Sequence, residues 1–116
     1  MVLAIVDDLM FSSKIRAAAG QLGVSLTFAR SKDAALAAIR DKVPALVILD
    51  LNSPRTDPLG TVAALKADAS TMAIRTIGYA SHVQTDVIEA ARQAGVDEVM
   101  ARSAFTARLA EILAGC

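Results

Sequence analysis

Five short apolar runs, separated by segments with helical spacing, constrain the fold of this chain more than any other feature. The runs occupy residues 2–6, 25–29, 45–49, 75–80 and 98–101, and each has the length of a β-strand. The first and third, VLAIV and ALVIL, are apolar at every position, which is typical of a central parallel strand covered by helices on both faces. The second run alternates more, so we expect it nearer an edge of the sheet.

The segments between and after the runs repeat apolar residues at intervals of three and four, the spacing of an amphipathic helix. These residues are Phe11, Ile15, Ala18 and Leu22, then Leu36, Ile39 and Val43, then Leu59, Val62 and Leu65, then Val87, Ala91 and Ala94, and finally Phe105, Leu109, Ile112 and Leu113. We expect Gly20 and Gly23 to end the first helix, and Gly95 to close the fourth. Ser31 is placed to cap the second helix, and Pro44 excludes helix just before the third strand.

Strands and helices that alternate five times predict an α/β fold with parallel strands and right-handed crossovers. The expected architecture is a doubly wound five-stranded sheet of the flavodoxin-like (βα)5 type, with strand order 2-1-3-4-5. Binding sites in such sheets lie at the carboxyl ends of the strands, where the strand order reverses. We therefore expect the functional site directly after Val6 and Leu49, where the first and third runs end.

Length and charge limit the functional classes. A chain of 116 residues predicts one domain over residues 1–116. Twelve basic residues balance twelve acidic ones, so no overall field attracts the chain to nucleic acid or to an anionic membrane. No apolar run approaches the roughly 18 residues of a membrane span, and the first is too short for a signal peptide. We expect a cytoplasmic protein in which Cys116, the single cysteine, is a terminal residue without an internal disulfide.

Three carboxylates occupy the predicted functional edge. Asp7 and Asp8 follow the first run, and Asp50 follows the third. Crowded carboxylates repel each other unless a cation compensates them, and hard oxygen ligands suit Mg²⁺. Asp50 could then act as a nucleophile toward a phosphoryl group. A plainer interpretation stays open, in which Asp7 or Asp8 caps the first helix and Asp50 begins a turn.

Two acidic signatures make the sequence similar to a known family. IVDD at residues 5–8 and VILDLNSP at residues 47–54 resemble those of response-regulator receiver domains of bacterial two-component systems. AARQAGVDEVMARSAF at residues 90–105 resembles the fourth helix, fifth strand and following loop of that family. The resemblance covers essentially the whole chain.

The resemblance implies a role for each acidic position. Asp7 and Asp8 would hold Mg²⁺, Asp50 would be the phosphoacceptor, and Asn52 would offer its backbone carbonyl to the metal. It also implies a histidine kinase as phosphodonor and a downstream protein as partner. The chain would not be an enzyme beyond transferring a phosphoryl group to its own Asp50 and hydrolysing it.

Several positions depart from the family pattern. The hydroxyl residue that usually ends the fourth strand is Ala80 here, although Ser81 follows it and could substitute. The usual Lys-Pro pair after the fifth strand is Arg102-Ser103, and an arginine is not equivalent to a lysine because its planar fork favours bidentate contacts. Arg102 could still pair with Asp50. The family's aromatic switch position on the fifth strand is Val99.

Other chemical classes find little support in the sequence. His82 is the only histidine, so no histidine metal cluster or catalytic dyad is available, and we interpret it as a loop residue beside the site. No P-loop or GxGxxG pattern is present, which disfavours a small enzyme or cofactor-binding domain on the same fold.

Two functions therefore compete. The leading hypothesis is a phosphorylatable receiver that signals through protein contacts, and the alternative is a pseudo-receiver that binds proteins without phosphorylation. By resemblance, the output surface would include Glu89, Arg92, Arg108 and Glu111. Ala107, Ala110 and Ala114 would let another helix approach closely, which allows a homodimer.

Overall fold

The computed structural model describes residues 1–81 and 84–115. Its strands are β1 (Val2–Ile5), β2 (Leu26–Ala29), β3 (Leu46–Asp50), β4 (Arg75–Ala80) and β5 (Glu98–Ala101). They form one parallel sheet in the order β2-β1-β3-β4-β5, which confirms the predicted fold class and places the second run at an edge. The predictions for His82 and Cys116 lie outside the described residues.

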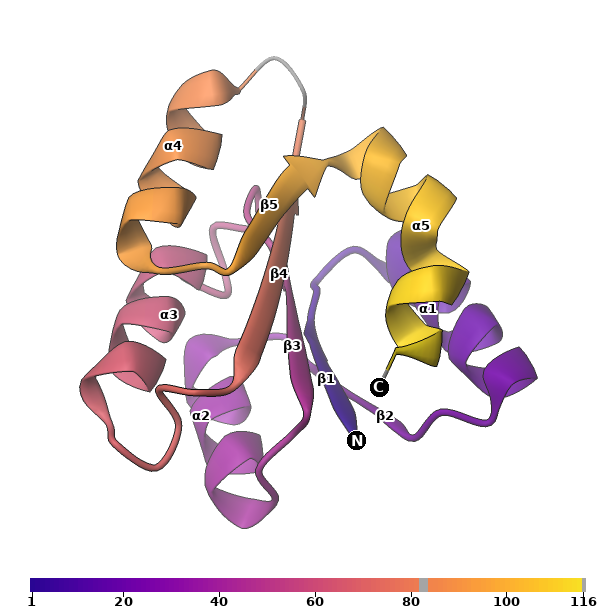
Figure 1. The fold of residues 1–116 in the computed structure, drawn as a ribbon, viewed down its shortest axis with the longest axis horizontal. Coiled ribbons are helices and arrows are strands. Elements are labelled where there is room, and N and C mark those ends of the chain that lie inside the picture. The colour runs from indigo at the N-terminus through magenta and orange to yellow at the C-terminus, as the bar shows by residue number, and fades with distance from the viewer. Residues whose placement is uncertain (82–83, 116) are drawn as a thin grey trace.

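Five helices cover both faces of the sheet (Figure 1). They are α1 (Leu9–Leu22), α2 (Lys32–Asp41), α3 (Pro58–Ala67), α4 (Thr85–Ala94) and α5 (Arg102–Ala114). Helices α1 and α5 pack on one face, whereas α2, α3 and α4 pack on the other. The sheet is thus the middle layer of three, as the continuous apolar runs predicted.

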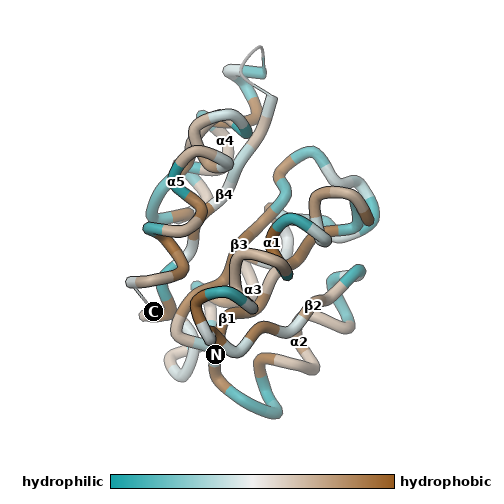
Figure 2. The backbone as a smooth tube through the Cα atoms, turned by 90° about the vertical axis from the view of Figure 1, so that its right-hand side faces the viewer, coloured by the Kyte–Doolittle hydropathy of each residue, from teal (hydrophilic) through white to brown (hydrophobic). Residues whose placement is uncertain are grey.

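Two hydrophobic clusters hold these layers together. Every apolar residue of β1 and β3 is fully buried, and burying one Val, Leu or Ile side chain contributes about 1.5–3 kcal/mol relative to exposure. Ile48 and Phe105 belong to the cluster under α1 and α5, and Leu49 and Val62 to the cluster on the opposite face. In Figure 2 the hydrophobic colour follows the central strands, while hydrophilic residues lie on loops and outer helix turns.

Local signals set most helix ends. The Ser31 hydroxyl accepts a hydrogen bond from the Ala34 N–H at 3.1 Å and caps α2. Gly23 and Gly95 end α1 and α4 with φ of 68° and 107°, a left-handed conformation that side chains disfavour. The expectation that Gly20 also ends the first helix was wrong, because α1 continues through it to Leu22 and only Gly23 adopts the left-handed cap.

Three residues assigned to apolar helix faces are exposed. Leu22, Val43 and Leu59 keep 43%, 57% and 37% of their surface accessible. Leu22 is the last residue of α1, Val43 lies beyond α2, and Leu59 stands in the first turn of α3. Ile39 and Leu65 are almost fully buried and pack with residues of β1 and β3.

Candidate functional site

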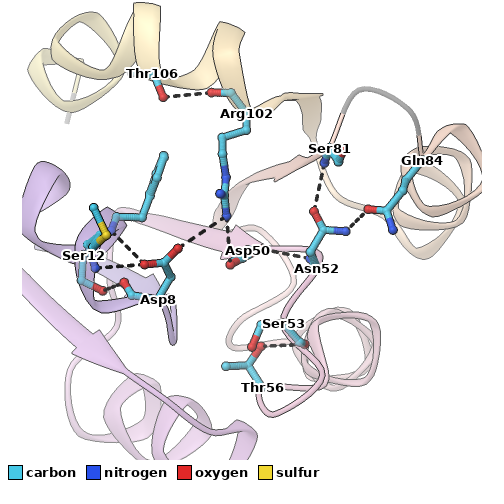
Figure 3. Close-up of polar contacts among 12 residues, drawn as sticks. Asp8, Ser12, Asp50, Asn52, Ser53, Thr56, Ser81, Gln84, Arg102 and Thr106 are labelled. Carbon is cyan, nitrogen blue, oxygen red and sulfur yellow. Dashed lines mark hydrogen bonds and ion pairs between the residues drawn. The ribbon is translucent and has the colours of Figure 1, made fainter.

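The carboxyl ends of the strands converge on one edge of the sheet, where most of the predicted site residues lie (Figure 3). Asp7 and Asp8 follow β1, Asp50 is the last residue of β3, and Ser81 follows β4. Arg102 follows β5 as the first residue of α5. Asp50 pairs in register with Tyr79 on β4, so these two residues share one level of the sheet.

Asp50 is nearly buried, with 4% of its surface exposed. Its Oδ1 accepts a hydrogen bond from the Asn52 N–H at 3.0 Å, and its backbone carbonyl accepts one from the Ser53 N–H at 3.3 Å. Asp50 therefore does begin the turn that the plainer interpretation foresaw. Burial raises the pKa of its carboxyl, although the Asn52 N–H and the Arg102 guanidinium both act to lower it.

Arg102 bridges two carboxylates, one before α1 and one at the end of β3. Its Nη2 lies 3.8 Å from Asp50 Oδ2 and 3.9 Å from Asp8 Oδ2. The guanidinium carbon also stands 5.0 Å from the centre of the Phe11 ring and 5.6 Å from that of the Tyr79 ring, within the range of cation–π attraction. The guanidinium group of Arg102 thus lies over the rings of Phe11 and Tyr79. Figure 3 shows its side chain pointing toward Asp8 and Asp50.

Asp8 has a capping role as well as a place in the site. Its Oδ1 accepts hydrogen bonds from the Met10 and Phe11 N–H groups at 2.9 and 3.2 Å, which caps α1. Its Oδ2 faces Arg102. The capping and site interpretations of Asp8 are therefore compatible, because each uses a different oxygen atom.

Asp7 faces another cation. Its Oδ2 lies 3.7 Å from Nε of Arg55, which belongs to the loop between β3 and α3. The sequence contains no spacing signal that would have paired these two residues, since the contact depends on the conformation of that loop.

The described residues contain no group of three or more His, Cys, Asp or Glu side chains arranged to hold a metal ion. The carboxylate oxygens are chemically suited to Mg²⁺, but Arg55 faces Asp7 and Arg102 faces both Asp8 and Asp50. The oxygen donors are therefore of the kind that a divalent cation needs, while in this arrangement guanidinium groups compensate the negative charge of the carboxylates.

Asn52 connects two loops at the rim of the site. Its side-chain Oδ1 accepts a hydrogen bond from the Ser81 N–H at 2.9 Å, and its Nδ2 donates to Gln84 Oε1. Sequence reasoning assigned only the backbone carbonyl of Asn52 and did not identify Gln84. The link joins residues 29 and 32 positions apart, so no local pattern could have indicated it.

An open cavity of about 830 Å³ lies beside these groups. It is lined by Asp8, Met10, Phe11, Lys14, Asn52, Ser81, Arg102, Ser103 and Thr106. Ser81 therefore borders the same space as Arg102, whereas Ala80 is fully buried at the end of β4. The cavity therefore leaves open space beside Asp8 and Arg102.

An aromatic cluster forms the base of the site. Tyr79 is fully buried between Phe11 and Phe105, with ring centres 4.8 and 4.7 Å away. Its hydroxyl is buried without a hydrogen-bond partner, and burial raises the pKa of the phenol. Val99, at the family's aromatic position, instead packs on the opposite face with the α2–α4 cluster.

Known structures match the fold of this chain over nearly its whole length. The receiver domain of NtrX from Brucella abortus has a TM-score of 0.83 at 21% identity, covering 99% of this chain and 98% of that one. The fold is that of response-regulator receiver domains. Neither a protein-family model nor a curated protein matches the chain.

Two further response-regulator structures share the fold. The Mn²⁺-bound response regulator Rcp1 has a TM-score of 0.79 at 20% identity, covering 98% of this chain and 88% of that one. The phosphorylated cyanobacterial phytochrome response regulator RcpA has a TM-score of 0.77 at 23% identity, with the same coverages. At these identities the similarity establishes the shared fold. In the part of this chain that the structure describes, no helix has the length and hydropathy to cross a bilayer.

Proposed function

We propose that this chain is a receiver of a two-component system that accepts a phosphoryl group on Asp50. The observation that carries the proposal is the placement of Asp50 at the carboxyl end of a central strand. Its Oδ1 is fixed by the Asn52 N–H, and Oδ2 faces a guanidinium beside the open cavity. A preorganised carboxylate with a cation nearby is suited to attack phosphorus.

The proposed donor is a histidine kinase. Asp50 Oδ2 would form the new O–P bond while the P–N bond of the kinase phosphohistidine breaks and its electron pair stays on the imidazole. Arg102 would face the negative charge on the transferred oxygens, since guanidinium groups bind phosphoryl oxygens well. Water would later cleave the aspartyl phosphate, so the chain would act as a switch and not as an enzyme on other substrates.

Mg²⁺ is the proposed cofactor, consistent with Rcp1 having been crystallised with Mn²⁺. Asp7, Asp8, Asp50 and the Asn52 backbone carbonyl would hold it. Binding would require Arg102 and Arg55 to leave the positions that they occupy beside these carboxylates.

The proposed output is a protein contact in the cytoplasm, with no direct nucleic-acid or membrane binding. Helices α4 and α5 carry charged side chains for it: Arg92 pairs with Glu89, and Arg108 pairs with Glu98 and Glu111. A homodimer through the alanines of α5 would use the same surface. Light scattering tests the dimer, because a monomeric mass at high concentration would exclude it.

Incubation with a small phosphodonor, followed by intact-mass measurement, tests the phosphorylation. The wild type should gain the mass of one phosphoryl group, and the Asp50→Asn variant should not. An unmodified wild type in the presence of Mg²⁺ would contradict the proposal.

One alternative has a specific observation in its favour. A pseudo-receiver would bind proteins without phosphorylation, and Arg102 already bridges Asp8 and Asp50. Ala80 lacks the hydroxyl that would respond to a phosphoryl group. Equal affinity of the wild type and the Asp50→Asn variant for the protein partner would favour the pseudo-receiver.

A further inference from the structure

Arg102 places a positive charge where the carboxyl ends of β1 and β3 meet. One nitrogen atom, Nη2, is within 4 Å of an oxygen of Asp8 and an oxygen of Asp50. These two carboxylates would otherwise repel each other across the site. We propose that Arg102 is an intramolecular counter-cation for the Asp8–Asp50 pair and competes directly with divalent cations for it.

The aromatic rings below Arg102 add cation–π contacts to its two ion pairs. Phe11 is 5% exposed and Tyr79 is fully buried, so the guanidinium lies over rigid rings of the protein core. Arg102 begins α5, whose backbone is held by the buried Phe105 one turn later. The cation is therefore tethered at a short distance and presented to both carboxylates at a high effective concentration.

The chemistry of guanidinium strengthens the competition. A guanidinium group is not deprotonated in proteins, so it cannot give up its place by losing a proton. A divalent cation can enter between Asp8 and Asp50 only if the side chain swings away and loses its contacts with both carboxylates and both rings. Arg102 and a divalent cation would occupy the same site. The free energy that Arg102 gains from its contacts there is therefore lost from the binding free energy of the metal.

This inference deepens the proposed metal site, and it does not depend on phosphorylation of Asp50. It predicts a protein whose site holds its conformation without metal, and which binds divalent ions only at raised concentration. The Arg102→Gln variant removes the charge but keeps a planar polar side chain. Lys14→Gln is the matched control, because Lys14 lines the same cavity but, among the described residues, forms no ion pair with Asp8 or Asp50.

Mn²⁺ titration, with free Mn²⁺ followed by electron paramagnetic resonance, measures the competition. Arg102→Gln should bind Mn²⁺ roughly tenfold or more tightly than the wild type, within the range of ordinary coupling between sites. Lys14→Gln should change the affinity much less. Adding Asp50→Asn to Arg102→Gln should remove the gain, which places the ion at this pair.

Thermal melting in a chelator gives a second, independent readout. Without metal, Arg102→Gln should melt below the wild type, and Mg²⁺ should restore it while moving the wild type little. Equal Mn²⁺ affinities in wild type and Arg102→Gln, including no binding by either, would overturn the inference. A failure of phosphorylation alone would contradict the proposed function and leave this competition intact, so the two outcomes are distinguishable.

Discussion

The side-chain Oδ1 of Asn52 accepts a hydrogen bond from the backbone N–H of Ser81 at 2.9 Å. This contact ties the loop after β3 to the end of β4, at the rim of the candidate site. The same side chain donates to Gln84, just before α4. Asn52 therefore links the loop after β3 both to Ser81 and to Gln84.

Asn52→Ala should remove the hydrogen bond to the Ser81 N–H. We expect the free energy of unfolding to fall by about 1 kcal/mol, the typical net contribution of one hydrogen bond, and amide exchange at Ser81 to accelerate. Hydrogen exchange by nuclear magnetic resonance measures the second effect. Gln84→Ala is the control, because it removes only the other partner of Asn52. Unchanged exchange at Ser81 in Asn52→Ala would show that the contact does not hold the loop.

Substitutions of Asp8 separate its capping role from its charge. Asp8→Ala should destabilise the protein by about 1 kcal/mol, because two N–H groups of α1 lose their acceptor. Asp8→Asn should stay close to the wild type, since Asn caps as well as Asp and an ion pair this exposed contributes little. Urea denaturation measures both. An equal loss of unfolding free energy in Asp8→Ala and Asp8→Asn would show that Asp8 stabilises the protein through its ion pair with Arg102 and not through capping.

Tyr79→Phe should raise the free energy of unfolding by up to about 1 kcal/mol. The Tyr79 hydroxyl is buried without a partner, and an unsatisfied buried polar group is destabilising. The ring contacts with Phe11 and Phe105 would remain. Tyr79→Leu is the contrasting variant, because it loses those ring contacts and should be less stable than the wild type. A destabilised Tyr79→Phe would mean that the hydroxyl has a hydrogen-bond partner, such as an ordered water.

The raised pKa of Asp50 makes stability depend on pH in a defined direction. The folded carboxyl binds a proton more tightly than the unfolded one, so the folded state holds more protons between the two pKa values. Stability from Asp50 is therefore present below its ordinary pKa and is lost as pH rises through the raised value. Asp50→Asn should lack this loss and be more stable than the wild type near neutral pH. Urea denaturation of both proteins from acidic to neutral pH measures the difference in stability between them. A wild type that becomes more stable relative to Asp50→Asn as pH rises would contradict the account.

Much of the fold could be predicted because its signals are local. The runs around Val2 and Leu46 specified buried strands, and Ser31, Gly23 and Gly95 marked helix ends that the structure confirms. Strand order followed from general rules for parallel sheets. Strand boundaries differ from the expected ranges by one residue at most, as at β3, which includes Asp50.

The contacts of the site were less predictable because they join distant elements. The sequence indicated that Asp8 and Asp50 would share an edge and that Arg102 could pair with Asp50, as it does. It did not indicate that Arg102 would also face Asp8 over the rings of Phe11 and Tyr79. That geometry depends on the direction in which α5 leaves β5. The pairing of Asp7 with Arg55 likewise depends on a loop conformation that no periodic pattern specifies.

The position of an acquired phosphoryl group tests the central claim most directly. After treatment with a small phosphodonor and Mg²⁺, the protein can be reduced with borohydride, which converts an aspartyl phosphate into homoserine and so marks the modified residue. Peptide mass mapping should find homoserine at position 50 in the wild type, and nowhere in Asp50→Asn. No conversion at residue 50, or conversion at Asp7 or Asp8 instead, would contradict the assignment of Asp50 as the phosphoacceptor.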